Sequence, residues 1–275
     1  MLVRLISGIL LLVILAVVMV SGGWLLFGFT LLISLIGFQE LIKATGVRTD
    51  PQKYSPVEMV GYIGIVAYYV LLFVRGMDAF SLFPIILTIM GMMLVYVLAF
   101  PKYDASRIMA AGFSFLYAPV FLSFIYLTRL LPHGIYLVWL IFCGSWASDT
   151  CAYVVGMLFG RHKLAPVLSP KKTIEGSVGG ILGAALIGYL YAYILCRFGT
   201  TDVTDAILWA FPAISAIGAL LSQIGDLAAS GIKRNHNIKD YGKLIPGHGG
   251  IMDRFDSVIV TAPLIYYCSM LFLHL

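Results

Sequence analysis

Residues 80–99 read FSLFPIILTIMGMMLVYVLA, an apolar run of 20 residues without a charged side chain. A helix rises about 1.5 Å per residue, so a run of this length spans about 30 Å, the thickness of the hydrocarbon core of a bilayer. Strands of a membrane barrel instead alternate apolar and polar residues over about ten positions, and this run shows no such alternation. It therefore predicts a transmembrane helix.

The composition of the whole chain extends this prediction. Of its 275 residues, 61% are hydrophobic and 11% are charged, whereas soluble domains carry roughly 25% charged residues. This difference excludes a water-soluble globule. Comparable apolar runs occupy residues 5–20, 24–42, 57–74, 80–99, 108–128, 134–159, 174–196, 206–229 and 257–274. We predict an all-α polytopic membrane helix bundle with about nine transmembrane helices and no soluble domain.

Ionisable residues divide the predicted bundle into two halves. Residues 1–133 form about five spans with almost no charge inside them. Residues 134–275 include the polar loop 230–256 and carry acidic residues within or beside their apolar runs. We therefore assign the chemistry to the C-terminal half and expect the N-terminal half to consist of transmembrane helices alone.

The basic residues predict the orientation of the chain. With the N-terminus in the cytoplasm, 15 of the 18 Lys and Arg residues fall in cytoplasmic segments, and only Arg75, Arg129 and Arg197 lie outside. An excess of Lys and Arg is typical of cytoplasmic loops, and an even number of spans would remove it. We expect a multi-pass protein of the cell membrane whose polar loop faces the cytoplasm, where nucleotides are found.

The loop at residues 230–256 reads SGIKRNHNIKDYGKLIPGHGGIMDRFD. Cations interleaved with carboxylates favour phosphates held together with a metal ion, whereas cations alone would favour anionic lipid. The glycines of the loop allow its backbone to approach a ligand closely, and His248 among them can donate to a phosphate or relay a proton. Asp253 and Asp256 are spaced i, i+3, which suits a Mg²⁺ site if a helix begins there. A solvated helix start is the alternative.

Asp149 lies inside the run 134–159, about 15 Å from its cytoplasmic end. An ionised carboxylate at that depth costs at least about 2.5 kcal/mol. It therefore faces a polar cavity, a cation or a helix partner; a protonated Asp149 in a helix–helix hydrogen bond is the alternative.

Residues 168–177 read LSPKKTIEGS and open the next apolar run. A helix N-terminus beside Lys171 and Lys172 is a good seat for a phosphate, because free N–H groups and the helix dipole both favour anions. The lysines could instead serve only the orientation of the chain, and Glu175 could only complement the dipole.

Asp226 lies near the cytoplasmic end of the run 206–229, in the sequence Gln223-Ile224-Gly225-Asp226. Its carboxylate could reach the polar loop without any function. The neighbouring Gly225, however, permits the close backbone approach that suits a ligand.

The loop also carries a recognisable pattern. Ser230-x-x-Lys233-Arg234-x4-Lys239-Asp240-x-Gly242-x3-Pro246-x-His248-Gly249-Gly250-x-x-Asp253-Arg254-x-Asp256 resembles the C-terminal signature of phosphatidate cytidylyltransferases, also called CDP-diacylglycerol synthases. The segments Ser148-Asp149-Thr150, residues 169–176 and Gly225-Asp226 are similar to those of bacterial members. The resemblance covers residues 134–275 by motif and the remainder by topology. The chain has neither a P-loop nor a Rossmann glycine motif, so a nucleotide would be bound by the membrane bundle itself.

This resemblance implies a Mg²⁺-dependent nucleotidyltransferase of phospholipid biosynthesis in the cell inner membrane. It converts CTP and phosphatidate, a membrane lipid, into CDP-diacylglycerol and pyrophosphate. The implied catalytic residues are Asp226, Lys233, Arg234, Lys239, Asp240, His248, Asp253 and Arg254. The implied substrate-binding residues are Ser148, Lys171, Lys172, Thr173, Glu175, Gly249 and Gly250. The implied metal ligands are Asp149, Asp226, Asp253 and Asp256. We expect no nucleic-acid partner and leave a homodimer open.

Other functions share parts of this pattern. A CTP-dependent lipid kinase, or a cytidylyltransferase for an isoprenoid lipid, would use the same combination of cations and carboxylates. A transporter would also fit the intramembrane Asp149 and a helix broken near Pro170. Against a transporter, the ionisable groups gather at one side of the membrane, which leaves few groups to complete an access path.

Overall fold

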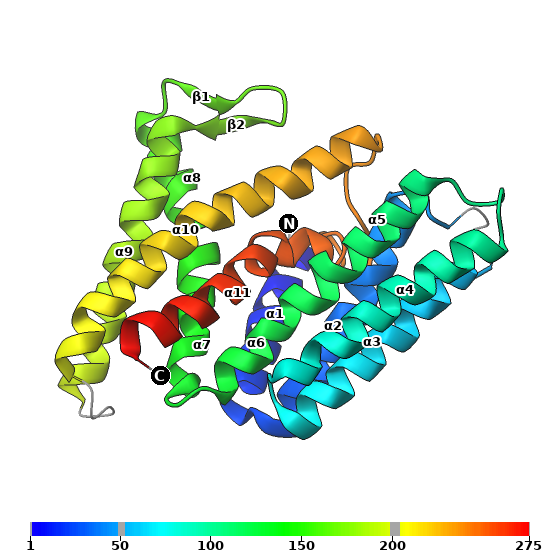
Figure 1. Ribbon diagram of the computed structural model, residues 1–275. Helices are drawn as coiled ribbons and strands as arrows, with labels where there is room; N and C mark the ends of the chain where they lie inside the picture. Colours follow the sequence, from blue (N-terminus) through cyan, green and yellow to red (C-terminus); the bar gives the residue numbers. More distant parts are fainter. Residues whose placement is uncertain (1, 49–52, 199–203, 275) are drawn as a thin grey trace. The chain divides into compact units, whose positions relative to one another are not determined.

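A computed structural model of the chain describes residues 2–48, 53–198 and 204–274. The regular structure within them is helical apart from one small hairpin and an isolated bridge between Ile245 and Gly249, which confirms the predicted all-α fold (Figure 1). The helices are α1 (Leu2–Ser21), α2 (Gly23–Ala44), α3 (Pro56–Arg75), α4 (Leu82–Leu98), α5 (Ala105–Phe115), α6 (Phe121–Leu130), α7 (Gly134–Phe142), α8 (Ser148–Phe159), α9 (Ile174–Arg197), α10 (Thr204–Asn235) and α11 (Met252–Leu273).

Pairs of these helices join into continuous spans. A π-helical turn, Leu116–Val120, links α5 to α6, and a second, Cys143–Ala147, links α7 to α8. Counted in this way over the described residues, eight helices are long and apolar enough to cross a membrane. The first predicted span corresponds to α1, whose apolar segment Ile6–Ser21 is shorter than those eight. The chain is thus a multi-pass membrane protein.

The outward faces of the helices are apolar. Val74 at the end of α3 is 72% exposed, Leu98 at the end of α4 is 77% exposed, and Trp209 in α10 is 81% exposed. In a soluble protein such surfaces would be unusual, but in a bilayer lipid chains cover them. The exposed apolar faces therefore agree with the membrane location that the composition predicts.

The described chain forms two compact units. The first comprises Met1–Leu127 with Asn235–Arg254, and the second comprises Thr128–Arg234 with Phe255–Leu275. Each is described by itself below.

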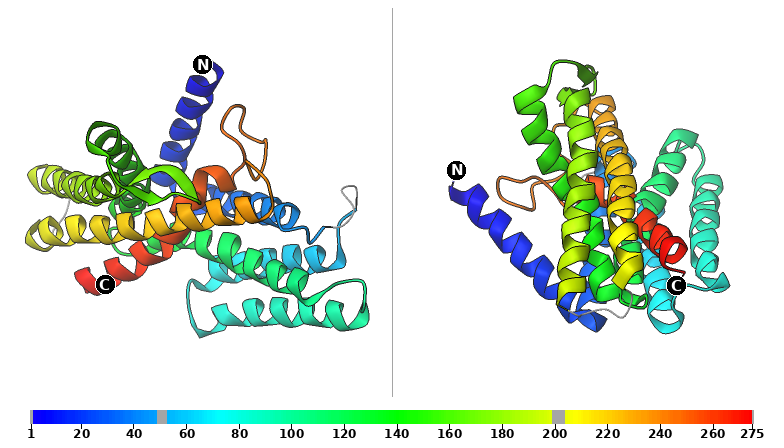
Figure 2. Two further views of the ribbon diagram at one scale, coloured as in Figure 1. Left: turned by 90° about the horizontal axis from the view of Figure 1, so that it is seen from above. Right: turned by 90° about the vertical axis from the view of Figure 1, so that its left-hand side faces the viewer.

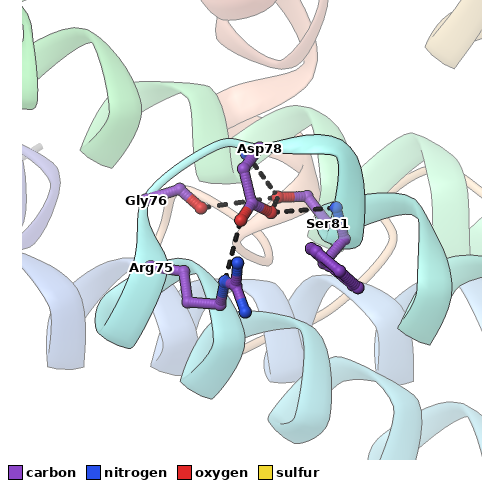
Figure 3. A network of polar contacts seen from close by, with 5 residues as sticks. Arg75, Gly76, Asp78 and Ser81 are labelled. Atoms are coloured by element: carbon purple, nitrogen blue, oxygen red, sulfur yellow. Dashed lines mark hydrogen bonds and ion pairs between the residues drawn. The ribbon is translucent and has the colours of Figure 1, made fainter.

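In the first unit α3 and α4 form a helical hairpin (Figures 1 and 2). Its turn is fixed by Asp78, whose carboxylate accepts hydrogen bonds from Phe80 N and from Arg75 Nε at 2.9 and 2.8 Å. The Asp78 N–H donates to Ser81 Oγ in return (Figure 3). This reciprocal pattern is a capping box, which satisfies the free N–H groups at a helix start.

In the second unit α8 and α9 lie side by side, joined by a hairpin of β1 (Lys163–Ala165) and β2 (Ser169–Thr173) (Figures 1 and 2). The antiparallel strands pair Lys163 with Thr173 and Ala165 with Ser169. The hairpin is an addition to the predicted architecture. It holds the segment that contains Lys171 and Lys172 beside the end of α8.

Glycines allow α8 and α9 to approach closely. A Cβ atom at Gly179 would lie 2.5 Å from Val155, and one at Gly183 would lie 2.5 Å from Cys151 Sγ. The hydrophobic effect does not drive helices together inside a bilayer, because lipid chains are as apolar as the side chains. Small residues let the backbones approach closely, so that van der Waals contacts stabilise the helix pair. This contact fixes the position of the side chains that α8 and α9 contribute to the site.

Candidate active site

The second unit contains a cavity of about 500 Å³. Its wall combines residues of α8, the hairpin, α9 and α10. These are Asp149, Ala152, Tyr153, Gly156, Met157, Leu164, Ser169, Lys171, Lys172, Thr173, Gly176, Ser177, Gln223 and Asp226. The three segments that sequence analysis selected from this unit, around Asp149, Lys172 and Asp226, thus meet at one cavity.

Asp149 is placed in the first turn of α8, directly after the π-helical turn Cys143–Ala147. Such turns are frequent at functional sites, because they rotate the following side chains relative to a regular helix. The Ser257 hydroxyl of α11 donates a hydrogen bond to the Asp149 carboxylate. Asp149 thus lines the cavity and also has a helix partner, which are two of the settings that the cost of its burial left open.

Lys172 and Asp226 form an ion pair inside the cavity wall. Their side chains are 25% and 26% exposed, so the pair is partly withdrawn from solvent, and the Lys172 Nζ atom itself is buried. Lys171 lies beside Lys172 on β2 and is exposed. The cavity wall thus offers both ammonium groups and carboxylates.

A third carboxylate, Asp256 of α11, interacts electrostatically with Asp226 and Asp149, and with the cation Lys233. Near Asp256 the helices α10 and α11 are in close contact, because a Cβ at Gly225 would lie only 3.0 Å from the Asp256 carbonyl oxygen. The glycine of the Gly225-Asp226 pair therefore serves helix packing, a role that its sequence neighbourhood did not distinguish from ligand approach.

These carboxylates fit a magnesium ion. Asp149 and Asp226 line the cavity, and Asp256 adds a third carboxylate that interacts electrostatically with both, so the site offers oxygen ligands of the kind that Mg²⁺ takes. No three His, Cys, Asp or Glu side chains among the described residues converge tightly enough to hold a metal by themselves. Mg²⁺ is usually bound by one or two carboxylates and completed by water and substrate phosphates, so this arrangement suits it.

Thr173 and Glu175 build the hairpin that carries the lysines. Thr173 Oγ1 caps α9 by accepting the Gly176 N–H at 3.1 Å. The Glu175 carboxylate accepts from Arg161 N at 3.0 Å and contacts His162 Nδ1 at 2.6 Å, on the opposite side of the hairpin. Both residues therefore hold the hairpin that carries Lys171 and Lys172, and Thr173 also lines the cavity; their role in substrate binding stays a prediction.

Gln223 and Ser177 are among the cavity residues that were not predicted as site residues. Gln223 Nε2 donates to the Ser177 carbonyl oxygen at 3.0 Å, and the Ser177 hydroxyl donates to Gln223 Oε1. This reciprocal pair joins α9 to α10 beside Asp226. Their sequence positions, within four residues of predicted site residues, were the available signal. Ser148 is buried at the α8–α9 contact, where a Cβ at Gly180 would lie 3.0 Å from its hydroxyl oxygen.

The first unit contains most of the polar loop. Asp253 is 7% exposed, and its Oδ2 accepts hydrogen bonds from Tyr241 N at 2.8 Å and Gly250 N at 3.0 Å. Gly249 has φ 86°, and a Cβ there would lie 2.8 Å from Asp253 Oδ2. Asp253 is thus an organiser of the loop, rather than a carboxylate on an exposed surface.

His248 is held from two directions within the first unit. Its carbonyl oxygen accepts the Arg254 Nε–H at 2.9 Å, and its Nδ1 lies 2.9 Å from Ser7 Oγ of α1. Arg234, Lys239 and Asp240 are exposed. The signature residues are therefore divided between the units: Lys233, Arg234 and Asp256 belong to the second, and Lys239, Asp240, His248, Asp253 and Arg254 to the first.

A multi-pass helical protein whose cavity brings lysines and carboxylates together is suited to handle phosphate groups at a membrane. The chain matches the Cytidylyltransferase family over residues 2–272 and belongs to that family, which makes it a nucleotidyltransferase.

Three relatives illustrate the similarity. The chain is 33% identical over 268 residues to the phosphatidate cytidylyltransferase of Staphylococcus saprophyticus, with 96% of both chains covered. It is 30% identical over 268 residues to the protein of the same name from Staphylococcus aureus, again with 96% of both chains covered. The corresponding protein of Staphylococcus epidermidis is 31% identical over 266 residues, at the same coverage.

Proposed function

We propose that the chain transfers the cytidylyl group of CTP to phosphatidate, which yields CDP-diacylglycerol and pyrophosphate. The observation that carries this proposal is the cavity in which the Lys172–Asp226 ion pair lies beside Asp149 and Lys171. The substrates follow from the similarity to proteins named phosphatidate cytidylyltransferase. The product is a precursor for phospholipid biosynthesis.

The reaction requires positioning and charge neutralisation more than covalent catalysis. A phosphate oxygen of phosphatidate attacks the α-phosphorus of CTP, a new P–O–P bond forms, and the bond from the α-phosphorus to the bridging oxygen breaks. Pyrophosphate leaves with that electron pair. Phosphatidate is ionised at neutral pH, so the attack needs no general base. Lys171 and Lys172 would hold phosphate oxygens and offset the charge that develops on them.

Carboxylates would hold the magnesium ion. Asp226, Asp149 and Asp256 are the proposed ligands in the second unit, and Asp253 is proposed from the family signature. A Mg²⁺ ion held there would supply positive charge that offsets the charge on the phosphates and on the leaving pyrophosphate. Lys233, Arg234 and Lys239 are proposed phosphate ligands, and His248 is proposed to orient a phosphate.

The excess of basic residues in one set of loops supports a cytoplasmic site, where CTP is available. A homodimer also remains part of the proposal, and the mass of the purified protein–detergent complex is its test.

Two forms of labelled CTP test the reaction. Purified protein in detergent is given phosphatidate and Mg²⁺ with CTP labelled at either the α- or the γ-phosphorus. We expect α-label in the lipid phase and γ-label in pyrophosphate, with both transfers abolished by a chelator and restored by excess Mg²⁺. Transfer of γ-label to lipid would instead identify a lipid kinase. A polyprenyl phosphate in place of phosphatidate tests the isoprenoid alternative.

A further inference from the structure

One acidic residue of the N-terminal helices, Glu40, has hydrogen-bond partners that the orientation of the chain in the membrane does not explain. Glu40 is the single charged residue of the apolar run 24–42. It lies near the end of α2 and is 6% exposed. A buried carboxylate is costly unless hydrogen bonds compensate it, so its partners indicate what it does.

Both oxygens of Glu40 bind the backbone where the signature loop enters α11. Oε1 accepts the Ile251 N–H at 3.1 Å, and Oε2 accepts the Met252 N–H at 2.8 Å. The first N–H groups of a helix have no partner within it, and the positive end of the helix dipole favours an anion. Glu40 therefore caps α11 from a helix more than 200 residues earlier in the chain.

Two glycines of the signature make room for this carboxylate. A Cβ at Gly242 and a Cβ at Gly250 would each lie 2.2 Å from Glu40 Oε1. Neither glycine has a positive φ in the described structure, so the backbone conformation does not require glycine at these positions. Contact with Glu40 accounts for the missing side chains.

The same face of α2 receives the start of α11. A Cβ at Gly37, one turn before Glu40, would lie 3.2 Å from Met252 Sδ. Met252 is fully buried, and Ile251 is 6% exposed. Glu40 and Gly37 thus form a seat for residues 251–252, next to Asp253, whose carboxylate holds Tyr241 N and Gly250 N.

We propose that Glu40 is a positioning residue for the reaction: its carboxylate, enclosed by Gly242 and Gly250, fixes the signature loop and the first turn of α11. The role in catalysis rests on the proposed function. The loop carries Lys239, His248 and Asp253, and a site that stabilises charge must hold its groups in place before the substrate arrives. Glu40 itself contacts backbone amides and is not proposed to contact substrate.

Hydrogen exchange tests the contact without any assay of activity. Glu40→Ala removes both acceptors, so we expect exchange in peptides covering residues 249–254 to accelerate by about tenfold or more. Glu40→Gln keeps one acceptor and should recover part of the protection. The matched control is Ser34→Ala, which removes a buried hydroxyl of α2 that contacts Tyr69 at 2.6 Å; exchange at 249–254 should stay unchanged.

A double-mutant cycle tests the enclosure. Gly250→Ala alone should lower turnover and disturb the loop, because its methyl group overlaps the carboxylate. In the Glu40→Ala background that methyl group has space, so the double variant should be no worse than Glu40→Ala. If the losses of turnover in the two single variants were fully additive in the double variant, the proposal that Gly250 makes room for the Glu40 carboxylate would be overturned.

Turnover of the same samples links the contact to catalysis. We expect Glu40→Ala to lower turnover, Glu40→Gln to restore part of it, and Ser34→Ala to match the wild type. Unchanged exchange at 249–254 in Glu40→Ala, or an equal rise in every peptide, would overturn the positioning role. A wild type that transfers no cytidylyl group would instead overturn the proposed function, since the exchange result stands without it.

Discussion

Asp226 connects the cation and the carboxylates of the cavity, because it pairs with Lys172 and interacts with both Asp149 and Asp256. Removing its charge leaves the cavity shape almost unchanged. The consequences should therefore appear in the chemistry and only weakly in stability.

We predict that Asp226→Asn lowers turnover of CTP and phosphatidate by roughly a hundredfold or more, the order of effect when one preorganised electrostatic contact is lost. Its thermal midpoint in detergent should stay close to that of the wild type, since the side chain is partly exposed. Asp104→Asn, which alters an exposed helix cap in the first unit, is the control. Full activity of Asp226→Asn would remove this residue from the site.

Lys172 is predicted to act on substrate binding. Lys172→Ala should raise the KM for an anionic substrate by about tenfold, because a hydrogen bond to a charged group contributes roughly 1.5–3 kcal/mol. Lys102→Ala is the matched control, since Lys102 lies outside the second unit and stacks on Tyr103. Steady-state kinetics with each substrate varied in turn measure the effect. Equal KM values for Lys172→Ala and Lys102→Ala would mean that Lys172 affects only the orientation of the chain in the membrane.

At this scale the sequence indicated Asp149 and Asp226 because a charge within an apolar run is costly, and Lys172 because it lies beside a predicted helix N-terminus. The same argument applies to Glu40, which also lies inside an apolar run, but no sequence pattern linked that residue to the polar loop. The burial of Asp253 and its two backbone hydrogen bonds could not be predicted either. They depend on how the loop folds back on itself, which spacing does not encode.

Among the elements, the hairpin between α8 and α9 determines where Lys171 and Lys172 lie. Its strands are three and five residues long, and β2 contains Pro170 and two lysines. No alternation of apolar and polar residues therefore predicted the hairpin. The start of α9 was predictable, since Thr173 followed by Glu175 is typical of a helix N-terminus. The clamp from Glu175 to Arg161 and His162 became visible only in the structure.

Thr173 tests whether this element matters for the site. Thr173→Ala removes the cap of α9 and should cost about 1 kcal/mol of stability, with a parallel rise in the KM that Lys172 controls. Thr173→Ser retains the capping oxygen and should preserve both properties. Thermal unfolding in detergent and kinetics on the same preparations provide the comparison. Identical behaviour of the two variants would show that the cap does not position the lysines.

For the whole molecule, composition was sufficient to predict a helical membrane bundle, and each of the nine predicted apolar runs is helical in the described residues. The unit that the polar loop joins could not be predicted, because residues 235–254 pack with N-terminal helices while residues on both sides belong to the second unit. An apolar pattern marks where a helix crosses the membrane. It does not mark which helices its neighbours are.

Metal binding tests directly whether the carboxylates of the cavity hold a divalent cation together with the phosphates of CTP. Mn²⁺ can be followed by paramagnetic resonance as a substitute for Mg²⁺. We predict that the wild type binds Mn²⁺ more tightly when CTP is present, because the phosphates complete the coordination. Asp226→Asn and Asp149→Asn should lose most of this gain, and Asp104→Asn should keep it. Equal binding by all four proteins would contradict the account.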